Sequence, residues 1–288
     1  MLDQRSADRT AMPELPEVET VRRGLALRLE GRRVRRLRLN RPDLRIPMPA
    51  DLPERVEGRR VDRLGRRAKY ILLHLEDGGV VIAHLGMSGR LVLSDAGNAA
   101  PPEPHDHVVF TLEDGTELRF NDARRFGVLD YADEKDLERH KFFMHLGPEP
   151  LGNAFNGPAL AAQLEGKATP LKAALLDQRV VAGLGNIYVS ESLFYAGLSP
   201  RRQAGTVAGP RAERLAQAIR DVLERAIAAG GSSLRDYVQA SGELGYFQHQ
   251  WAVYGKEGER CPGCDCRQGI KRIVQSGRST FYCGKRQR

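Results

Sequence analysis

A proline followed by a carboxylate, near the start of the chain, is the first feature of the sequence that could do chemistry. Met12 stands directly before Pro13 and Glu14, in the run MPELPEVET. If translation starts at Met12 and that methionine is removed, Pro13 becomes a secondary amine with a pKa of about 8, partly nucleophilic at neutral pH. Such an amine can attack a sugar C1′ to form an iminium, which acidifies C2′ and permits strand scission by elimination. Glu14 could transfer protons and Glu17 could orient the site.

The alternative for the same segment is a proline-rich lead-in to a helix, with glutamates on the surface. The eleven residues that precede Met12 bear on this choice. If they are retained, Pro13 has an ordinary amide nitrogen and the amine chemistry is impossible. We therefore expect residues 1–12 to be a non-native or misassigned extension.

Four cysteines are the second chemical feature, and all of them follow position 260: Cys261, Cys264, Cys266 and Cys283. In a chain of 288 residues they do not resemble a disulfide framework. Their four thiolates could hold a tetrahedral zinc ion, although the short spacing between Cys264 and Cys266 strains simultaneous coordination. A hairpin without metal is the alternative.

Charge is distributed unevenly along the chain, whose formal net charge is +8. Residues 31–69 hold fourteen Arg or Lys against five Asp or Glu, and residues 255–288 hold nine against three. Such basic stretches favour a polyanionic partner, with ordinary solvated faces as the alternative. No apolar stretch approaches the roughly 20 residues of a membrane helix, and residues 1–11 lack the apolar core of a secretory signal. We expect a cytoplasmic protein.

Hydrophobic periodicity predicts a strand-rich first half and a helical second half. Apolar residues recur at helical spacing over residues 16–29. Apolar runs flank Asp and Gly turn residues within 70–84 and within 107–120, which predicts two hairpins. Apolar residues from 212 to 227 predict a long helix.

Three stretches are typical of connections or small modules. Residues 95–106 hold several prolines and few apolar side chains, which predicts a mobile loop. Residues 147–158 have the same character and predict a link between domains. The cysteine-bearing tail after Tyr254 is too short to hold an apolar core unaided, so it needs a staple.

The run MPELPEVET closely resembles the amino terminus of the formamidopyrimidine-DNA glycosylases. The likeness continues, in chain order, through GRRAKYILL, HLGMSGRL, HDHV, NDARRFG, HLGPEPL, GLGNIYVSESLF, YFQHQWAVYG and GRSTFYC. The related endonuclease VIII branch typically has a glycine where this chain has Leu15. The resemblance therefore covers almost the whole chain and favours the first branch.

The resemblance implies an α+β protein of several domains. An N-terminal catalytic β-sandwich with flanking helices would span residues 13–147, and a linker would span 148–158. A helix-two-turn-helix DNA-binding domain would occupy 159–250, and a zinc-ribbon-like finger would occupy 251–288. One structural zinc ion and no organic cofactor are implied.

The implied function is that of a monomeric, bifunctional DNA glycosylase and AP lyase of base excision repair. It would remove 8-oxoguanine and formamidopyrimidines from damaged duplex DNA and cut the strand by β,δ-elimination. Two alternatives stay open. One is a non-catalytic DNA-binding member of the same fold, and the other is a pyrimidine-specific glycosylase of the endonuclease VIII kind.

The resemblance also assigns roles at the reacting sugar. Pro13 would be the Schiff-base nucleophile, Glu14 the general acid or base, and Lys69 the proton donor in β-elimination. Arg278 would act in δ-elimination and grip the phosphate of the flipped nucleotide.

Further residues would contact the DNA around the lesion. Met87, Arg124 and Phe126 match side chains that fill the space of the flipped nucleotide, a role that suits a thioether, a guanidinium and an aromatic ring. The matching DNA contacts elsewhere are His105, Lys167 and Asn186. The loop from Ser232 and Ser233 toward Tyr246 resembles the loop that reads the lesion.

The metal site departs from the family's pattern. The usual position of the fourth ligand is Arg286, which cannot bind zinc, and sixteen residues separate Cys266 from Cys283 as the family's ribbon requires. Cys261 and Cys266 would then form the first pair, with Cys264 a compensating or an idle thiol. A loosened ribbon would misplace the δ-elimination arginine before it disturbed the nucleophile.

Overall fold

The computed structural model describes residues 12–97, 101–232 and 246–288. Expectations about residues 1–11, and about the lesion-reading loop from Ser233 to residue 245, lie outside the described residues. The chain divides into two units. We call the unit of residues 12–144 and 230–232 the sandwich unit, and the unit of residues 145–229 and 246–288 the helical unit.

The first helix of the sandwich unit, α1 (Leu15–Leu29), begins at a capping box. The Glu14 side chain accepts the backbone N–H of Glu17, and the Glu17 side chain accepts that of Glu14. Pro16 lies in the first turn, where its missing N–H costs no hydrogen bond. The helical periodicity predicted for this segment is confirmed by its buried apolar face: Val18, Val21, Leu25 and Leu29.

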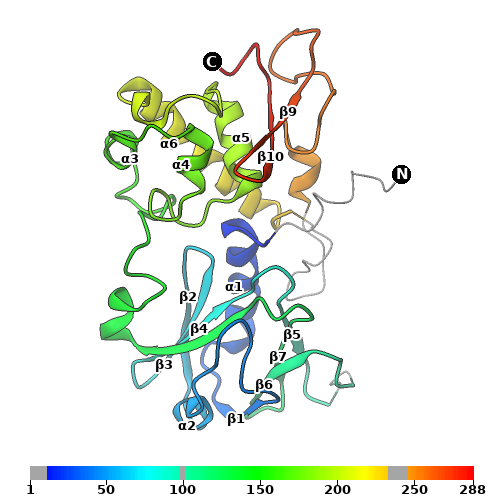
Figure 1. The fold of residues 1–288 in the computed structure, drawn as a ribbon. Helices are drawn as coiled ribbons and strands as arrows, with labels where there is room; N and C mark the ends of the chain where they lie inside the picture. Colours follow the sequence, from blue (N-terminus) through cyan, green and yellow to red (C-terminus); the bar gives the residue numbers. More distant parts are fainter. Residues whose placement is uncertain (1–11, 98–100, 233–245) are drawn as a thin grey trace. The chain divides into compact units, whose positions relative to one another are not determined.

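Two four-stranded antiparallel sheets make up most of the sandwich unit (Figure 1). One sheet has the order β1 (Val34–Leu39), β6 (Asp106–Leu112), β7 (Glu117–Asn121), β5 (Arg90–Ser94). The other has the order β2 (Val61–Arg67), β3 (Tyr70–Leu75), β4 (Gly79–His84), β8 (Val128–Asp133). Both predicted hairpins are confirmed, since β3 pairs with β4 and β6 pairs with β7. The short helices are α2 (Leu52–Val56) and the 3₁₀ helix η2 (Glu134–Arg139).

Helix α1 packs against β2 and β3 of the second sheet. Strand β4 is buried along almost its whole length, as expected for a central strand covered on both faces. Burial of this kind, at about 25 cal/mol per Å² of apolar surface, fixes the register of the strands. The ends of these strands carry the site residues of the unit.

The helical unit contains four α-helices, two 3₁₀ helices and one hairpin among its described residues. They are α3 (Gly157–Leu164), α4 (Leu171–Leu176), α5 (Asn186–Ala196), η3 (Ala204–Thr206), α6 (Pro210–Ala228), η4 (Phe247–Gln250), β9 (Lys271–Gln275) and β10 (Arg278–Tyr282). The predicted long helix is α6, and its buried face packs on α3 and α5. None of the helices in the described ranges is long and apolar enough to cross a membrane.

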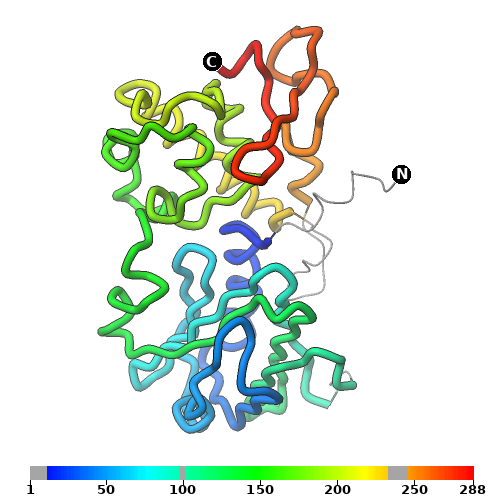
Figure 2. The backbone as a smooth tube through the Cα atoms, in the orientation of Figure 1, coloured from blue at the N-terminus to red at the C-terminus, as the bar shows by residue number. Residues whose placement is uncertain are grey.

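The terminal hairpin packs on the helices instead of standing alone. Strand β10 contacts α5, and both figures of the whole chain show this hairpin, in red, beside that helix (Figures 1 and 2). A tight turn joins its strands, with Ser276 at φ +49° and Gly277 at φ +71°. The turn places Arg278 at the start of the returning strand.

Candidate functional site

The carboxylate of Glu17 organises the start of α1, directly after Pro13. Its Oε2 accepts the backbone N–H of Glu14 at 2.9 Å, and its Oε1 accepts that of Ser232 at 2.8 Å. Glu14 and Glu17 are 3% and 0% exposed, and Pro13 is buried. Gly231, at φ +77°, lies so close that an added Cβ would be 3.2 Å from Glu17 Oε1. The two glutamates thus lie in a fixed, buried arrangement instead of on a solvated surface.

Lys69 occupies the tight turn between β2 and β3. The turn is formed with Ala68 at φ +52°, and Lys69 is only 7% exposed. Pairing of Tyr70 with His84 places the end of β4 beside this turn. Burial first, and then the charges of Lys69 and Arg45, lower the pKa of His84 from its ordinary value of 6.5 to about 4. The site therefore combines a buried lysine with a histidine that is neutral at physiological pH.

The low pKa of His84 predicts a loss of stability in mild acid. The unfolded chain takes up a proton near pH 6.5, whereas the folded chain resists it until about pH 4, so stability present above pH 6.5 is lost as the pH falls between these values. We expect His84→Asn, which keeps an acceptor for the Gly86 N–H, to remove up to about 3 kcal/mol of this dependence. Urea unfolding of the unchanged protein and of His84→Asn from pH 7.5 to 4.5 measures this pH dependence. The same fall in the free energy of unfolding in both proteins would contradict the low pKa of His84.

Met87, Arg124 and Phe126 come from two loops, residues 85–90 and 122–127, which we call the insertion loops. The loops lie against each other, because a Cβ on Gly86 would be 2.4 Å from the Phe126 backbone. Arg124 and Phe126 are exposed, and the guanidinium lies 4.7 Å from the centre of the phenyl ring. Phe126 is 42% exposed, which is unusual for an aromatic side chain in a core role.

Two residues that the sequence analysis did not single out hold the insertion loops together. Ser88 Oγ donates to Asp122 Oδ1 at 2.5 Å and accepts the Arg124 N–H at 3.2 Å. The other carboxylate oxygen of Asp122 accepts the Gly127 N–H at 2.7 Å. The only sequence signal for these residues is that they flank the matching side chains within HLGMSGRL and NDARRFG.

Residues 101–105, within the predicted loop at 95–106, precede β6 and form no helix or strand. Their backbone is fixed by buried side chains of β6 and β7, including Arg119 and Asn121. These side-chain contacts were not predicted, because sequence periodicity does not reveal them, and the mobility of the loop stays a prediction. His105 is exposed at the end of this stretch, at φ +77°.

In the helical unit, Asn186 is the first residue of α5, and its side-chain amide is already used within the protein. Nδ2 donates to Ser279 O at 3.0 Å and to the Tyr254 hydroxyl at 3.3 Å. The resemblance implies that Asn186 contacts DNA, whereas in this structure its side-chain N–H groups bind Ser279 of β10 and the hydroxyl of Tyr254. Lys167 is partly buried between α3 and α4, and Arg278 is exposed.

Buried charged groups that the sequence analysis missed support these residues. Lys172, fully buried, donates from Nζ to Ser279 O at 2.9 Å and to Thr280 Oγ1 at 2.7 Å. Because a buried ammonium is costly without partners, this contact ties α4 firmly to the strand that begins with Arg278. No local sequence pattern marks such a lysine, since its partners lie more than 100 positions further along the chain.

A buried carboxylate of α5 holds a second segment of the helical unit in place. Glu191 accepts the backbone N–H groups of Ala252, Val253 and Tyr254 at 2.8, 3.0 and 2.9 Å. Burial raises its pKa, and these three hydrogen bonds oppose the rise. Tyr254 is thereby held where its hydroxyl meets Asn186.

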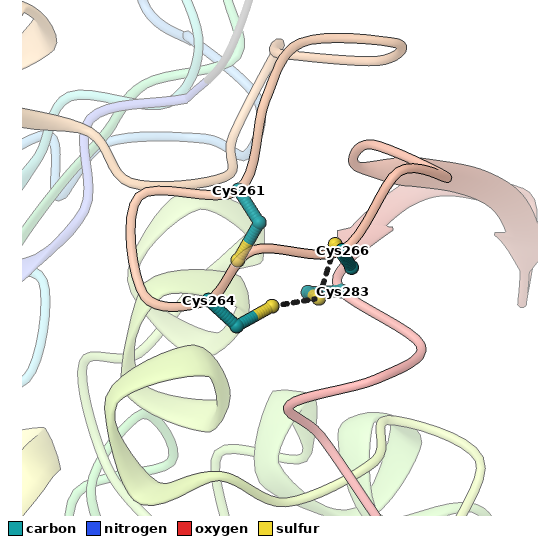
Figure 3. Close-up of side chains that lie close together, drawn as sticks. All are labelled: Cys261, Cys264, Cys266 and Cys283. Carbon is teal, nitrogen blue, oxygen red and sulfur yellow. Dashed lines mark hydrogen bonds between the residues drawn. The ribbon is translucent and has the colours of Figure 1, made fainter.

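All four cysteine sulfurs converge at the base of the terminal hairpin (Figure 3). They lie within 4.8 Å of one another, and Cys264 and Cys266 are each 3.5 Å from Cys283. Four sulfurs about 2.3 Å from a tetrahedral zinc ion would be about 3.8 Å apart, so the cluster fits this metal. The short spacing from Cys264 to Cys266 does not keep either sulfur out of the cluster.

Arg286 occupies the position where the resemblance places a fourth ligand, and it contacts α5 and the cysteine loop. Its Nε donates to Phe194 O at 3.2 Å, and Nη1 donates to Gly263 O at 3.2 Å. The guanidinium also lies 4.9 Å from the centre of the Phe194 ring. Arg286 thus ties the cysteine loop to α5, while Cys264 supplies the fourth sulfur.

Comparison with known proteins gives matches in both units. The model of the formamidopyrimidine-DNA glycosylase N-terminal domain matches residues 12–129, and that of the formamidopyrimidine-DNA glycosylase H2TH domain matches residues 146–238. A formamidopyrimidine-DNA glycosylase of Rhodospirillum centenum is 60% identical, with 96% of this chain and 100% of the relative covered. The corresponding protein of Rhodospirillum rubrum is 56% identical at the same coverage.

Solved structures agree with these matches. The MutM (Fpg) protein of Thermus thermophilus has a TM-score of 0.84 and 42% identity, covering 96% of this chain and 98% of that one. A Lactococcus lactis FPG mutant in complex with a Fapy-dG containing DNA has a TM-score of 0.87 and 32% identity, covering 96% and 100%.

Proposed function

The chain belongs to the formamidopyrimidine-DNA glycosylase family and is a DNA glycosylase of base excision repair, and we propose that Pro13 is its nucleophile. The observation that carries this proposal is the buried clamp at the start of α1. Glu17 holds the backbone of Glu14 and Ser232, and the residue before this clamp is Pro13. The match to the family begins at residue 12, so the working chain of this proposal begins at Pro13.

The proposed reaction uses residues of the sandwich unit for the first steps. The lone pair of the Pro13 nitrogen forms a bond to C1′ while the bond from C1′ to the damaged base breaks, and Glu14 carries the proton that this exchange requires. The C1′–O4′ bond of this aminal then breaks as O4′ takes up a proton, which opens the sugar and leaves an iminium between C1′ and the Pro13 nitrogen. The iminium acidifies C2′, and loss of a C2′ proton expels the phosphate at C3′ in β-elimination. Lys69 serves as the proton donor for this step.

The proposed DNA contacts use exposed and partly exposed side chains of both units. Met87, Arg124 and Phe126 fill the space that the flipped nucleotide leaves, which their shared position on the insertion loops supports. His105 and Lys167 contact the DNA backbone near the lesion, and Asn186 does so by exchanging its hydrogen bonds to Ser279 and Tyr254 for one to a phosphate. Arg278 binds the phosphate of the flipped nucleotide and takes part in δ-elimination.

The proposed metal is one structural zinc ion bound by Cys261, Cys264, Cys266 and Cys283. The sulfur separations support this ligand set. When bound, zinc would join the cysteine loop to the end of β10 and so stiffen the hairpin that carries Arg278. We also propose the finer division of the chain into a linker at 148–158, a helical domain at 159–250 and a finger at 251–288.

Substrate preference tests the function. We expect the chain that begins at Pro13 to release 8-oxoguanine and formamidopyrimidines from duplex DNA at least about tenfold faster than oxidised pyrimidines, since a site that hydrogen-bonds its substrate base discriminates against bases that leave those groups unpaired. Product release from matched duplexes, each with one lesion, measures the preference. Faster release of oxidised pyrimidines would indicate an enzyme of the endonuclease VIII kind, and no release from any duplex would indicate a non-catalytic DNA-binding protein.

A further inference from the structure

The stretch from 101 to 105 ends in an unusual backbone conformation. His105 has φ +77°, in the left-handed region that side chains with a Cβ rarely adopt. A conformation of this kind persists only where the surroundings hold it in place. His105 is itself exposed, so the structure that holds it lies among its neighbours.

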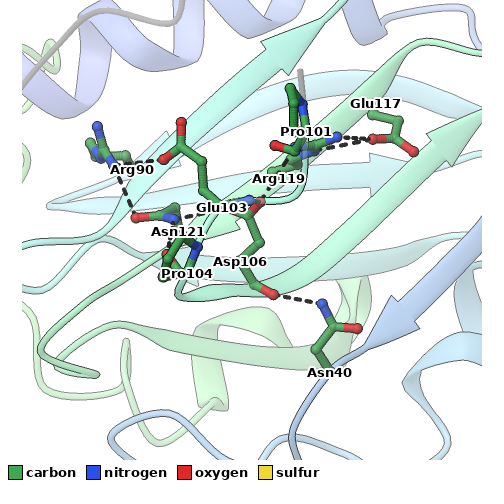
Figure 4. A network of polar contacts seen from close by, with 9 residues as sticks. All are labelled: Asn40, Arg90, Pro101, Glu103, Pro104, Asp106, Glu117, Arg119 and Asn121. Carbon is green, nitrogen blue, oxygen red and sulfur yellow. Dashed lines mark hydrogen bonds and ion pairs between the residues drawn. The ribbon is translucent and has the colours of Figure 1, made fainter. Parts of the chain in front are cut away.

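The carboxylate of Asp106 is the centre of that structure (Figure 4). Oδ2 accepts the Glu103 N–H at 2.9 Å and faces Arg119 Nη1 at 3.4 Å. Oδ1 accepts from Asn121 Nδ2 at 2.9 Å. Asp106, Arg119 and Asn121 are all less than 10% exposed, so these contacts are shielded from water.

The two partners of Asp106 also bind the loop backbone directly. Arg119 Nη1 donates to Pro101 O at 3.0 Å, and Asn121 Nδ2 donates to Pro104 O at 2.9 Å. Arg119 is oriented from the other side by Glu117, at 2.7 Å. Prolines offer no backbone N–H of their own, so their carbonyls are the groups by which the loop can be fixed.

The same network reaches the insertion loops. The carbonyl of His105 accepts the Asp122 N–H at 3.1 Å, and Asp122 also binds Ser88 and Gly127 with its carboxylate. Cross-strand pairing of Asp106 with Asn121 sets the register between the two segments. The position of His105 is thus fixed relative to the side chains proposed to enter the DNA.

We propose that Asp106, Arg119 and Asn121, which we call the loop brace, are positioning residues that preset His105 for its contact with a DNA phosphate. This inference rests on the proposed function, in which His105 contacts DNA. A contact residue that is already in its bound conformation loses less conformational entropy on binding. The brace therefore raises affinity for DNA without touching the DNA, and it does so through His105.

A double-mutant cycle tests the brace in the chain that begins at Pro13. The probe is a duplex with a tetrahydrofuran abasic-site analogue, and affinities are compared for His105→Ala, Asp106→Ala and the double variant. We expect each single variant to bind about tenfold more weakly and the double variant to bind no more weakly than either. Single-turnover release of 8-oxoguanine by Asp106→Ala at saturating DNA should change less than about twofold, because the brace acts on binding.

The loop brace and the contact of His105 with DNA are overturned by different outcomes. Losses that multiply in the double variant would overturn the brace while leaving the His105 contact in place. Unchanged affinity of His105→Ala would overturn the proposed contact and the brace with it. Asn121→Ala gives a second brace variant if Asp106→Ala does not fold. Val80→Ala, in the other sheet, is the control that lowers stability, and a loss of affinity there equal to that of Asp106→Ala would also contradict the proposal.

Discussion

We expect borohydride to trap a chain that begins at Pro13 on an 8-oxoguanine duplex, and we expect no adduct from a chain that retains residues 1–12. In the longer chain the Pro13 nitrogen is part of an amide, whose lone pair is delocalised and does not attack C1′. Loss of the nucleophile should lower the rate of base release with strand cleavage by at least about a thousandfold. Gel assay of the adduct, with mass spectrometry of its peptides, measures both amount and position.

A matched control separates the amine from the fold. The chain that begins at Pro13 can be acetylated at its N-terminus, which blocks the nitrogen and leaves the Glu14 and Glu17 side chains in place. It should bind the abasic-site duplex but give no adduct. An adduct of equal yield from the longer chain, mapped to a residue such as Lys69, would show that another amine is the nucleophile.

The elements around this site were predictable because their signals are local. The apolar period and the Pro16 lead-in of α1, and the Asp and Gly turns of the two hairpins, are all contained in short windows. The register of a hairpin follows from such turns. Among the site residues, Pro13 and Glu14 were singled out from their own chemistry, whereas Lys69, Arg278 and the DNA contacts were expected only from the resemblance to a family.

Interactions between distant parts of the chain could not be predicted. Lys172 meets β10 and Glu191 meets residues 252–254, and neither carries a pattern that distinguishes it from a surface charge. The loop brace is similar, since a proline-rich stretch is typical of mobile loops unless buried side chains bind its carbonyls. Burial and pairing of charges depend on the tertiary fold, which a single sequence does not display.

The cysteine site could be predicted in part from the sequence. Four thiols after position 260 indicated a metal, but their spacing left Cys264 either a ligand or an idle thiol. The structure places its sulfur 3.5 Å from that of Cys283 and uses Arg286 to bind Gly263 and α5. In the proposed zinc site, the sulfur of Cys264, from the preceding loop, takes the place of a ligand at position 286.

We expect Cys264→Ser to weaken zinc binding by at least about a hundredfold. Loss of a residue that only hydrogen-bonds to a metal ligand lowers metal affinity by up to about a hundredfold, and loss of a ligand itself should lower it further. Native mass spectrometry with competing chelators measures the affinity. With cobalt in place of zinc, the thiolate-to-metal absorption should fall by about a quarter, from four thiolates to three. Asp265→Ser, an exposed change in the same loop, is the control and should leave both readouts unchanged.

Restoring a thiol at the other position makes the test specific. Cys264→Ser with Arg286→Cys should recover the cobalt absorption of four thiolates, although it removes the contacts from Arg286 to Phe194 and Gly263. In Cys264→Ser alone, δ-elimination should fall before trapping at Pro13 does, because the loosened hairpin carries Arg278 whereas the nucleophile lies in the sandwich unit. Full zinc affinity in Cys264→Ser would instead identify Cys264 as the idle thiol and leave the metal with three cysteine ligands.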